Sequence, residues 1–65
     1  MRFKYYEIDN RKFKVEEINE EHYELTMFDD GNFVGTWNFV GKNAHAEILA
    51  EILSYSEITD DDYNA

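Results

Sequence analysis

The residues best suited to chemistry lie in the segment EEINEEHYE, residues 16 to 24, which holds five glutamates and one histidine. A histidine beside carboxylates is a ligand set that divalent metals accept, and it can also act as a catalytic base. However, no second histidine lies nearby, and Glu20 and Glu21 fall in a turn, where side chains are exposed and mobile. We therefore interpret His22 and its neighbours as a solvated acidic end of a hairpin rather than as a metal site.

Two further motifs have a simpler structural interpretation. The segment DDGN, residues 29–32, is similar to the start of a calcium loop, but the twelfth position from Asp29 is Val40 instead of a glutamate. Gly35 and Gly41 flank TWNFV without the lysine that a phosphate loop needs. A glycine inside a strand predicts close approach by a helix or an aromatic ring, and leaves room for a bulge. We expect Trp37 to lie in the core, with an exposed binding platform as the alternative.

Catalysis has little support in this sequence. The chain has no cysteine, and Ser54 and Ser56 lie at the end of a predicted helix without an adjacent base. His45 falls in the first turn of that helix, where a structural role is the simpler interpretation. A catalytic carboxylate pair needs a concave pocket that separates the two pKa values, for which so small a domain rarely has room. We therefore expect a protein that is not an enzyme, with no catalytic residue, metal or cofactor.

Charge is the strongest compositional signal. Fifteen acidic residues against six lysines and arginines give the 65-residue chain a formal net charge of −9. Such a surface repels nucleic-acid phosphates and anionic lipids and attracts basic proteins, so we expect a basic protein partner, no membrane contact and no direct nucleic-acid binding. The sequence shows no apolar run long enough to cross a bilayer and no secretory signal at its start, and it lacks cysteine. These features favour a cytoplasmic location.

The chain predicts a four-stranded antiparallel meander. Segments rich in aromatic and β-branched residues cover roughly 2–8, 12–18, 22–28 and 33–40, with Asn, Asp and Gly between them. We expect a four-residue first loop and three-residue second and third loops, the third with a G1 bulge. The expected pairs are Tyr6–Val15, Glu7–Lys14 and Ile8–Phe13; Phe13–Met27 and Val15–Leu25; and Tyr23–Trp37, Leu25–Gly35 and Met27–Phe33.

One amphipathic helix is expected after the meander. Asn43 is suited to cap it, and AHAEILAEILSY repeats apolar residues at helical spacing, which places Ile48, Leu49, Ile52 and Leu53 on one stripe. This stripe should cover the sheet face that carries Tyr23, Leu25 and Trp37. The prediction is a single α+β domain over residues 1–56, followed by an acidic, flexible tail over residues 57–65.

A single helix leaves the other sheet face uncovered. Alternation places five apolar residues there, and a contiguous exposed apolar patch on a small protein marks an interface, a homodimer being the simplest form. This predicted apolar interface consists of Phe3, Tyr5, Phe28, Val34 and Val40.

The acidic residues suggest a second kind of interface. Carboxylates on alternate strand residues repeat every ~6.6 Å, and those one helical turn apart every ~6 Å. Such a row can imitate the phosphates of DNA and occupy a cleft built for nucleic acid. The alternative is that the acidity only keeps the protein soluble. The predicted acidic protein-binding surface consists of Glu16, Glu17, Glu20, Glu21, Glu24, Glu47, Glu51, Asp60, Asp61 and Asp62.

In size and charge alone, the chain resembles the small acidic DNA-mimic inhibitors that phages and plasmids use against restriction, repair or CRISPR enzymes. Its meander and helix also resemble the positive cofactor 4 family of dimeric single-strand nucleic-acid binders. It departs from that family in having few basic residues. The leading hypothesis is an inhibitor of a basic, nucleic-acid-handling protein; the alternatives are a homodimeric structural or regulatory module and a weak single-strand binder.

Overall fold

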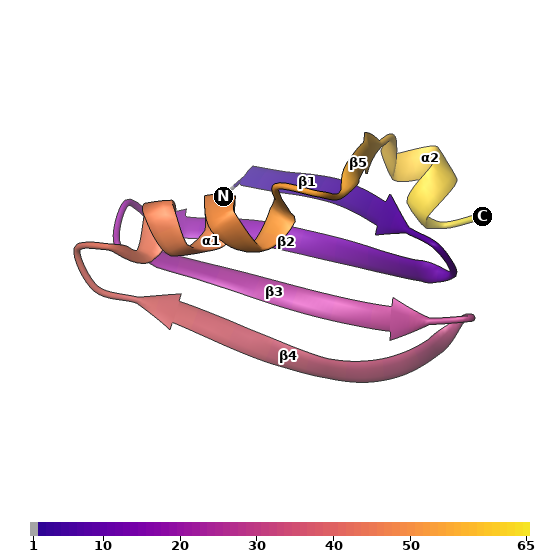
Figure 1. Ribbon diagram of the computed structural model, residues 1–65, viewed down its shortest axis with the longest axis horizontal. Helices are drawn as coiled ribbons and strands as arrows, with labels where there is room; N and C mark the ends of the chain where they lie inside the picture. Colours follow the sequence, from indigo (N-terminus) through magenta and orange to yellow (C-terminus); the bar gives the residue numbers. More distant parts are fainter. Residues whose placement is uncertain (1) are drawn as a thin grey trace.

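The computed structural model describes residues 2–65 and consists of one antiparallel sheet (Figure 1) with a helix on each face. The α+β class and the initial meander are confirmed, but the sheet has five strands, in the order β4-β3-β2-β1-β5, instead of four. Along the chain the elements are β1 (Arg2–Ile8), β2 (Arg11–Asn19), β3 (His22–Asp29), β4 (Asn32–Val40), α1 (Ala44–Ile52), β5 (Ser56–Ile58) and α2 (Asp60–Tyr63). None of the described helices is long and apolar enough to span a membrane.

All three hairpins turn through two residues, so the loops are shorter than the sequence predicts. In the third, Asp30 and Gly31 both have positive φ, 52° and 83°, which is the type I′ geometry that matches the twist of paired strands. Asp9 adopts a φ of 55° in the first. In the second, the Glu21 N–H donates to Asn19 Oδ1 at 2.8 Å, so the asparagine side chain stabilises the turn.

The shorter loops change two of the three predicted registers. Tyr6 pairs with Phe13 instead of Val15, and Leu25 pairs with Trp37 instead of Gly35. The predicted pairing of β2 with β3, Val15 with Leu25, is confirmed. Both errors are shifts of two residues, and side chains alternate between faces with a period of two. The predicted faces of these residues are therefore correct although their partners are wrong.

Phe33 is the exception. Met27 pairs with Gly35 and Phe28 pairs with Phe33, which leaves Val34 as an extra, bulged residue in β4. The bulge moves Phe33 to the face of Phe28, where the two rings meet edge to face at 5.7 Å. The prediction that Phe33 joins the face of Met27 is therefore wrong.

Gly35 provides the close approach that its position predicted. A Cβ atom built at Gly35 would lie 3.3 Å from the Trp37 ring, so the indole folds over the backbone of its own strand. Trp37 lies on the core side of the sheet, yet its side chain is exposed and outside the buried cluster, so the prediction that it lies in the core is wrong.

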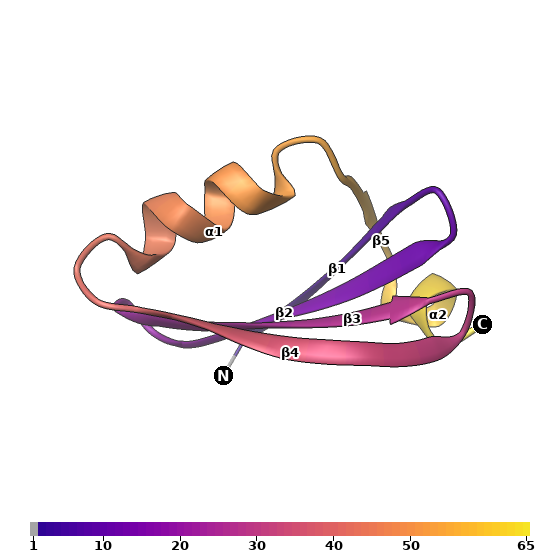
Figure 2. The same cartoon turned by 60° about the horizontal axis from the view of Figure 1, so that its bottom comes forward.

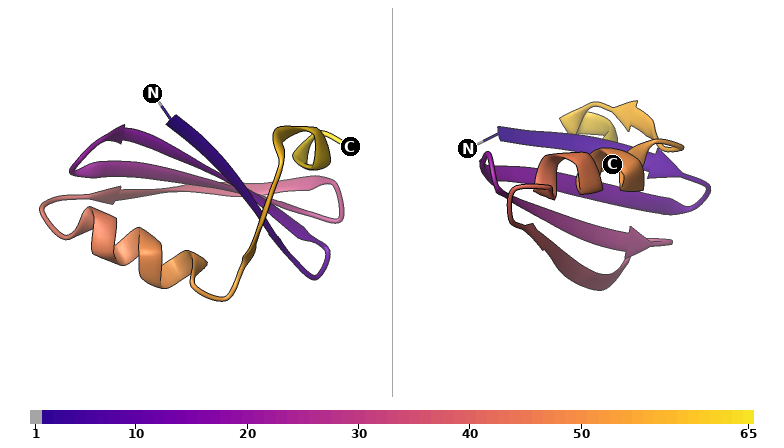
Figure 3. Two further views of the ribbon diagram at one scale, coloured as in Figure 1. Left: turned by 90° about the horizontal axis from the view of Figure 1, so that it is seen from above. Right: turned by 60° about the vertical axis from the view of Figure 1, so that its left-hand side comes forward.

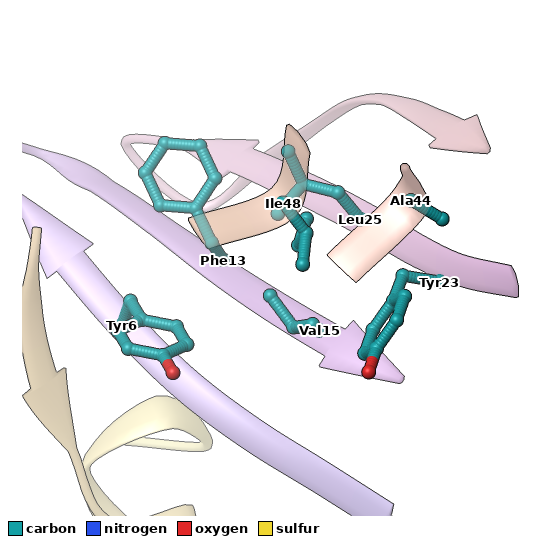
Figure 4. Close-up of a cluster of buried hydrophobic side chains, with 7 residues drawn as sticks. All are labelled: Tyr6, Phe13, Val15, Tyr23, Leu25, Ala44 and Ile48. Atoms are coloured by element: carbon teal, nitrogen blue, oxygen red, sulfur yellow. The ribbon is translucent and has the colours of Figure 1, made fainter. Parts of the chain in front are cut away.

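The core lies between α1 and the sheet, as Figure 4 shows. The helix contacts it through Ala44, Ile48 and Ile52, which are four residues apart and therefore form a single narrow line. Leu49 and Leu53, predicted on the same stripe, are exposed. Asn43 precedes α1 as predicted, but its side chain makes no capping hydrogen bond. The buried residues are Tyr6, Phe13, Val15, Tyr23, Leu25, Ala44 and Ile48.

Residues 57–65, predicted as a flexible tail, contain instead the end of β5 and the helix α2. Ile58 and Glu57 pair with Tyr5 and Tyr6 of β1, which adds β5 to the sheet. The chain then passes to the opposite face, so that α1 and α2 lie on different sides of the sheet (Figures 2 and 3). At the start of α2, the Asp62 N–H donates to Thr59 Oγ1 at 3.1 Å.

Candidate functional site

The most unusual acidic feature is a pair of glutamates that face each other on adjacent strands. Glu16 of β2 is directly opposite Glu24 of β3, on the sheet face away from α1, and both are half-buried. Like charges at directly opposed positions destabilise a sheet. The one ion pair among residues 2–65 joins Arg11 to Asp29 at 3.4 Å, and Lys14 lies over the Phe3 ring at 5.5 Å. No cation of the chain therefore pairs with Glu16 or Glu24 in this part of the structure.

The neighbouring acids extend this feature around the β2–β3 turn. Glu17 pairs with Tyr23 on the opposite face, and Glu20 and Glu21 form the turn itself. The pKa of the Tyr23 hydroxyl is raised, first by burial and then by the negative charges of Glu17 and Glu20, with Arg2 opposing them. These contacts place the carboxylates together at one end of the sheet. We call this set the acidic hairpin end: Glu16, Glu17, Glu20, Glu21 and Glu24.

The other predicted acids lie elsewhere. Glu47 and Glu51 are exposed on α1, where the Tyr55 hydroxyl donates to Glu51 at 3.1 Å. Burial, and then this hydrogen bond and charge, raise the pKa of Tyr55. The acidic run Asp60–Asp62 begins α2, at the end of the molecule opposite the β2–β3 turn (Figure 1). Negative charge is favourable at the N-terminus of a helix, so these three acids have a structural explanation. The predicted acidic surface is thus divided into three groups: the acidic hairpin end, the pair on α1 and the run at the start of α2.

The histidines make ordinary structural contacts. His22 Nε2 lies 2.8 Å from Asn38 Oδ1 on the adjacent strand β4. The His45 ring stacks on Tyr23, with 5.7 Å between ring centroids. Within residues 2–65, no three side chains of the metal-binding types come together. The His22 ring is thus held against β4, and the His45 ring against β3.

The predicted apolar interface is partly covered by the chain itself. Tyr63 of α2 packs on Tyr5 at 4.7 Å and on Phe28 at 6.3 Å, ring to ring. Lys12 Nζ donates to the carbonyl oxygens of Asp62 at 2.7 Å and Ala65 at 3.3 Å, which holds α2 against the sheet. Burial, and then Tyr5, raise the pKa of Tyr63. Phe3, Val34 and Val40 remain exposed.

Tyr63 and α2 are what the sequence reasoning missed, although a signal for them exists. The segment Thr59-Asp60-Asp61-Asp62 fits the capping-box pattern of a threonine followed three residues later by an acid. Read as a helix start, it would have placed Tyr63 on a helix. Read only as a run of acids, it suggested disorder.

A pocket of about 530 Å³ opens beside α2. Three acids (Glu7, Asp9 and Asp30), the rings of Phe28 and Tyr63, and one cation, Lys12, are among the residues that line it. A cationic side chain is attracted both to carboxylates and to the faces of aromatic rings. Lys12 already donates to backbone carbonyls of Asp62 and Ala65, so the three acids leave the lining with a negative balance that favours a cationic group over an anion.

No family model, curated protein or solved structure matches this chain.

Proposed function

We propose that this chain is a protein-interaction module that binds a basic, nucleic-acid-handling protein through fixed carboxylates, and so competes with nucleic acid. The observation that carries the proposal is the opposed pair Glu16 and Glu24, which no cation of the described chain neutralises. A partner that supplies lysine or arginine side chains would remove this repulsion and gain charge-assisted hydrogen bonds.

The position of the two glutamates supports a binding role over simple solubility. Acids that serve only solubility can be placed anywhere on the surface, including loops where they repel one another weakly. Opposed carboxylates in paired strands cost about 0.2–1 kcal/mol of stability. They also hold charge in fixed places, as a nucleic-acid backbone does. The pocket beside α2 offers a second place for a cationic side chain of the same partner.

Electrostatic attraction defines how such a partner would bind. A chain of formal charge −9 attracts a basic protein over about a Debye length, so association is fast at low salt and weakens as salt rises. The carboxylates occupy the partner's nucleic-acid cleft, and duplex DNA competes for the same residues. In this proposal the chain itself carries out no reaction.

The test is affinity capture from bacterial lysate with and without competing duplex DNA, washed at low and at high salt. The key variant is Glu16→Gln with Glu24→Gln, and the matched control is Glu47→Gln with Glu51→Gln on α1. Both double variants change the net charge equally. We expect a nucleic-acid-binding protein that DNA displaces and that the Glu16/Glu24 variant no longer retains.

Two outcomes would contradict this proposal. Equal weakening by both double variants would show that only total charge matters. Capture that neither salt nor DNA reduces would remove nucleic-acid competition from the mechanism.

A further inference from the structure

The two edges of the sheet differ in how they are protected. At one edge, β5 covers Tyr5–Glu7 of β1, and the rest of β1 carries Arg2 and Lys4. Short strands and basic side chains are the usual protection of a sheet edge against pairing with other chains. At the other edge, β4 is nine residues long, and within the described sheet no strand lies beyond it (Figure 1).

β4 also has an unusual sequence for this protein. Its residues, NFVGTWNFV, include no charged residue and no proline, although 32% of the chain is charged. Four large apolar side chains on it are exposed: Phe33 61%, Val34 48%, Trp37 44% and Val40 68%. They lie on both sides of the strand, since Trp37 shares the α1 face and Val40 pairs with His22 on the other. An open, uncharged, apolar edge is a template for another strand.

The free hydrogen-bonding groups of β4 follow from its pairing with β3. The Gly41 N–H donates to the Glu21 carbonyl at 2.8 Å. Because hydrogen-bonded and non-hydrogen-bonded pairs alternate in an antiparallel ladder, Phe39, Trp37 and Gly35 direct their backbone groups toward β3. The N–H and C=O groups of the residues between them point to the open edge. These residues are Thr36, Asn38 and Val40.

We infer that β4 pairs antiparallel with β4 of a second copy of this chain, making one continuous ten-stranded sheet across a twofold axis at Asn38. Between the bulge at Val34 and Gly41, the three residues with outward groups are symmetric about Asn38. This register therefore satisfies these three, with Asn38 opposite Asn38 and Thr36 opposite Val40 of the partner subunit. It also places Trp37 beside Phe39 of the partner subunit on the α1 face.

Charge favours a second copy along this strand over any other approach. Two chains of formal charge −9 repel each other, and β4 is the segment where neutral surfaces can meet. A twofold contact is self-complementary, so an edge with free groups on alternate residues matches its own copy without further adaptation. The acidic hairpin end and the pocket beside α2 involve other residues, so the dimer does not depend on the proposed function.

The dependence on salt concentration distinguishes the β4 dimer from binding to a basic protein. Screening removes the repulsion between the two copies, so the dimer should become tighter as salt rises, whereas binding to a basic protein should become weaker. Sedimentation equilibrium of the whole chain at low and high salt measures this directly. A chain that stays monomeric at high concentration in high salt would overturn the inference.

The decisive variant is Val40→Lys, with Leu53→Lys as its matched control. Both replace an exposed apolar side chain by lysine and change the net charge equally, but Leu53 is the C-cap residue of α1 and lies outside β4. A lysine on the edge should raise the dimer dissociation constant by about tenfold or more, because a charged side chain on an edge strand opposes pairing with another strand. The control should leave it within about twofold. Equal effects of the two variants would refute β4 as the contact.

Amide hydrogen exchange gives a readout that does not depend on a variant. In the dimer, the amides of Thr36, Asn38 and Val40 become protected as protein concentration rises, whereas those of Trp37 and Phe39 are protected at every concentration. If the sample associates but the protection of the Thr36, Asn38 and Val40 amides does not change with concentration, the contact lies elsewhere.

Discussion

The two faces of the sheet differ in how a helix packs on them. On one face, α1 places Ala44 and Ile48 against a continuous layer of buried strand residues, and Tyr55 stacks on Phe13 with 4.3 Å between ring centroids. On the other face, the four residues of α2 make their contact chiefly through one side chain, Tyr63, and through the hydrogen bonds of Lys12. The first face supplies most of the apolar burial, and hence most of the stability.

This difference leaves the second face available for interactions. Because α2 covers only the end near Tyr5 and Phe28, the opposed glutamates and Phe3 stay accessible. A small domain buries a limited fraction of its surface, so it can rarely make two complete cores. In this protein, one face determines the fold and the other presents charge.

The largest expected effect is the loss of the α1 contact. Ile48 is 2% exposed, and Ile48→Ala should lower the free energy of unfolding by about 2–5 kcal/mol, since it removes buried methyl groups and leaves a cavity. Leu53, which is 85% exposed, is the matched control, and Leu53→Ala should change it by less than about 0.5 kcal/mol. Urea denaturation measures both. Similar losses would mean that α1 does not pack as described.

A smaller effect is expected on the second face. Tyr63→Ala removes the ring contacts with Tyr5 and Phe28, and should lower the free energy of unfolding by about 1–2 kcal/mol. Amide exchange should become faster in β5 and α2 but stay unchanged in β3. Tyr63→Phe keeps the ring and should behave nearly as the parent. If Tyr63→Ala left the free energy of unfolding unchanged, the hydrogen bonds of Lys12, rather than the Tyr63 ring, would be what holds α2 on the sheet.

The smallest effect is a gain in stability. Glu24→Gln removes the repulsion of Glu16 across the ladder and should raise the free energy of unfolding by about 0.2–1 kcal/mol at low salt. The gain should shrink at high salt, which screens the charges. Glu21→Gln in the turn changes the net charge equally without removing an opposed pair, so it should gain less. An equal gain from both would show that the opposition of Glu16 and Glu24 has no local cost.

Much of this fold follows from alternation in the sequence. The sequence correctly predicts which strand residues face the core: Phe13, Val15, Tyr23 and Leu25. Side chains alternate between the two faces with a period of two, so a register shift of two residues leaves each side chain on its predicted face. The predicted loop lengths are wrong, since Asp9 and Asp30 adopt left-handed conformations that aspartate takes up less often than glycine.

The candidate surfaces were harder to predict than the strands. The confirmed register of β2 with β3 already implies that Glu16 lies opposite Glu24, but the sequence does not show that neither has a cation of residues 2–65 as its partner. The exposed position of Phe33 depends on the bulge at Val34, which the sequence marks only by the nearby Gly35. The contacts of Tyr63 are tertiary, so no local pattern identified its partners. Such long-range contacts are what a single sequence specifies least directly.

The pairing of β5 with β1 bears on the order of events during folding. The meander contains only neighbouring hairpins, whereas Tyr5 and Ile58 come from segments separated by almost the whole sequence. Local contacts form early, because closing a long loop costs more chain entropy. We therefore expect a nascent chain on the ribosome to complete the meander first, and to add its last strand only after residues 56–58 have left the exit tunnel.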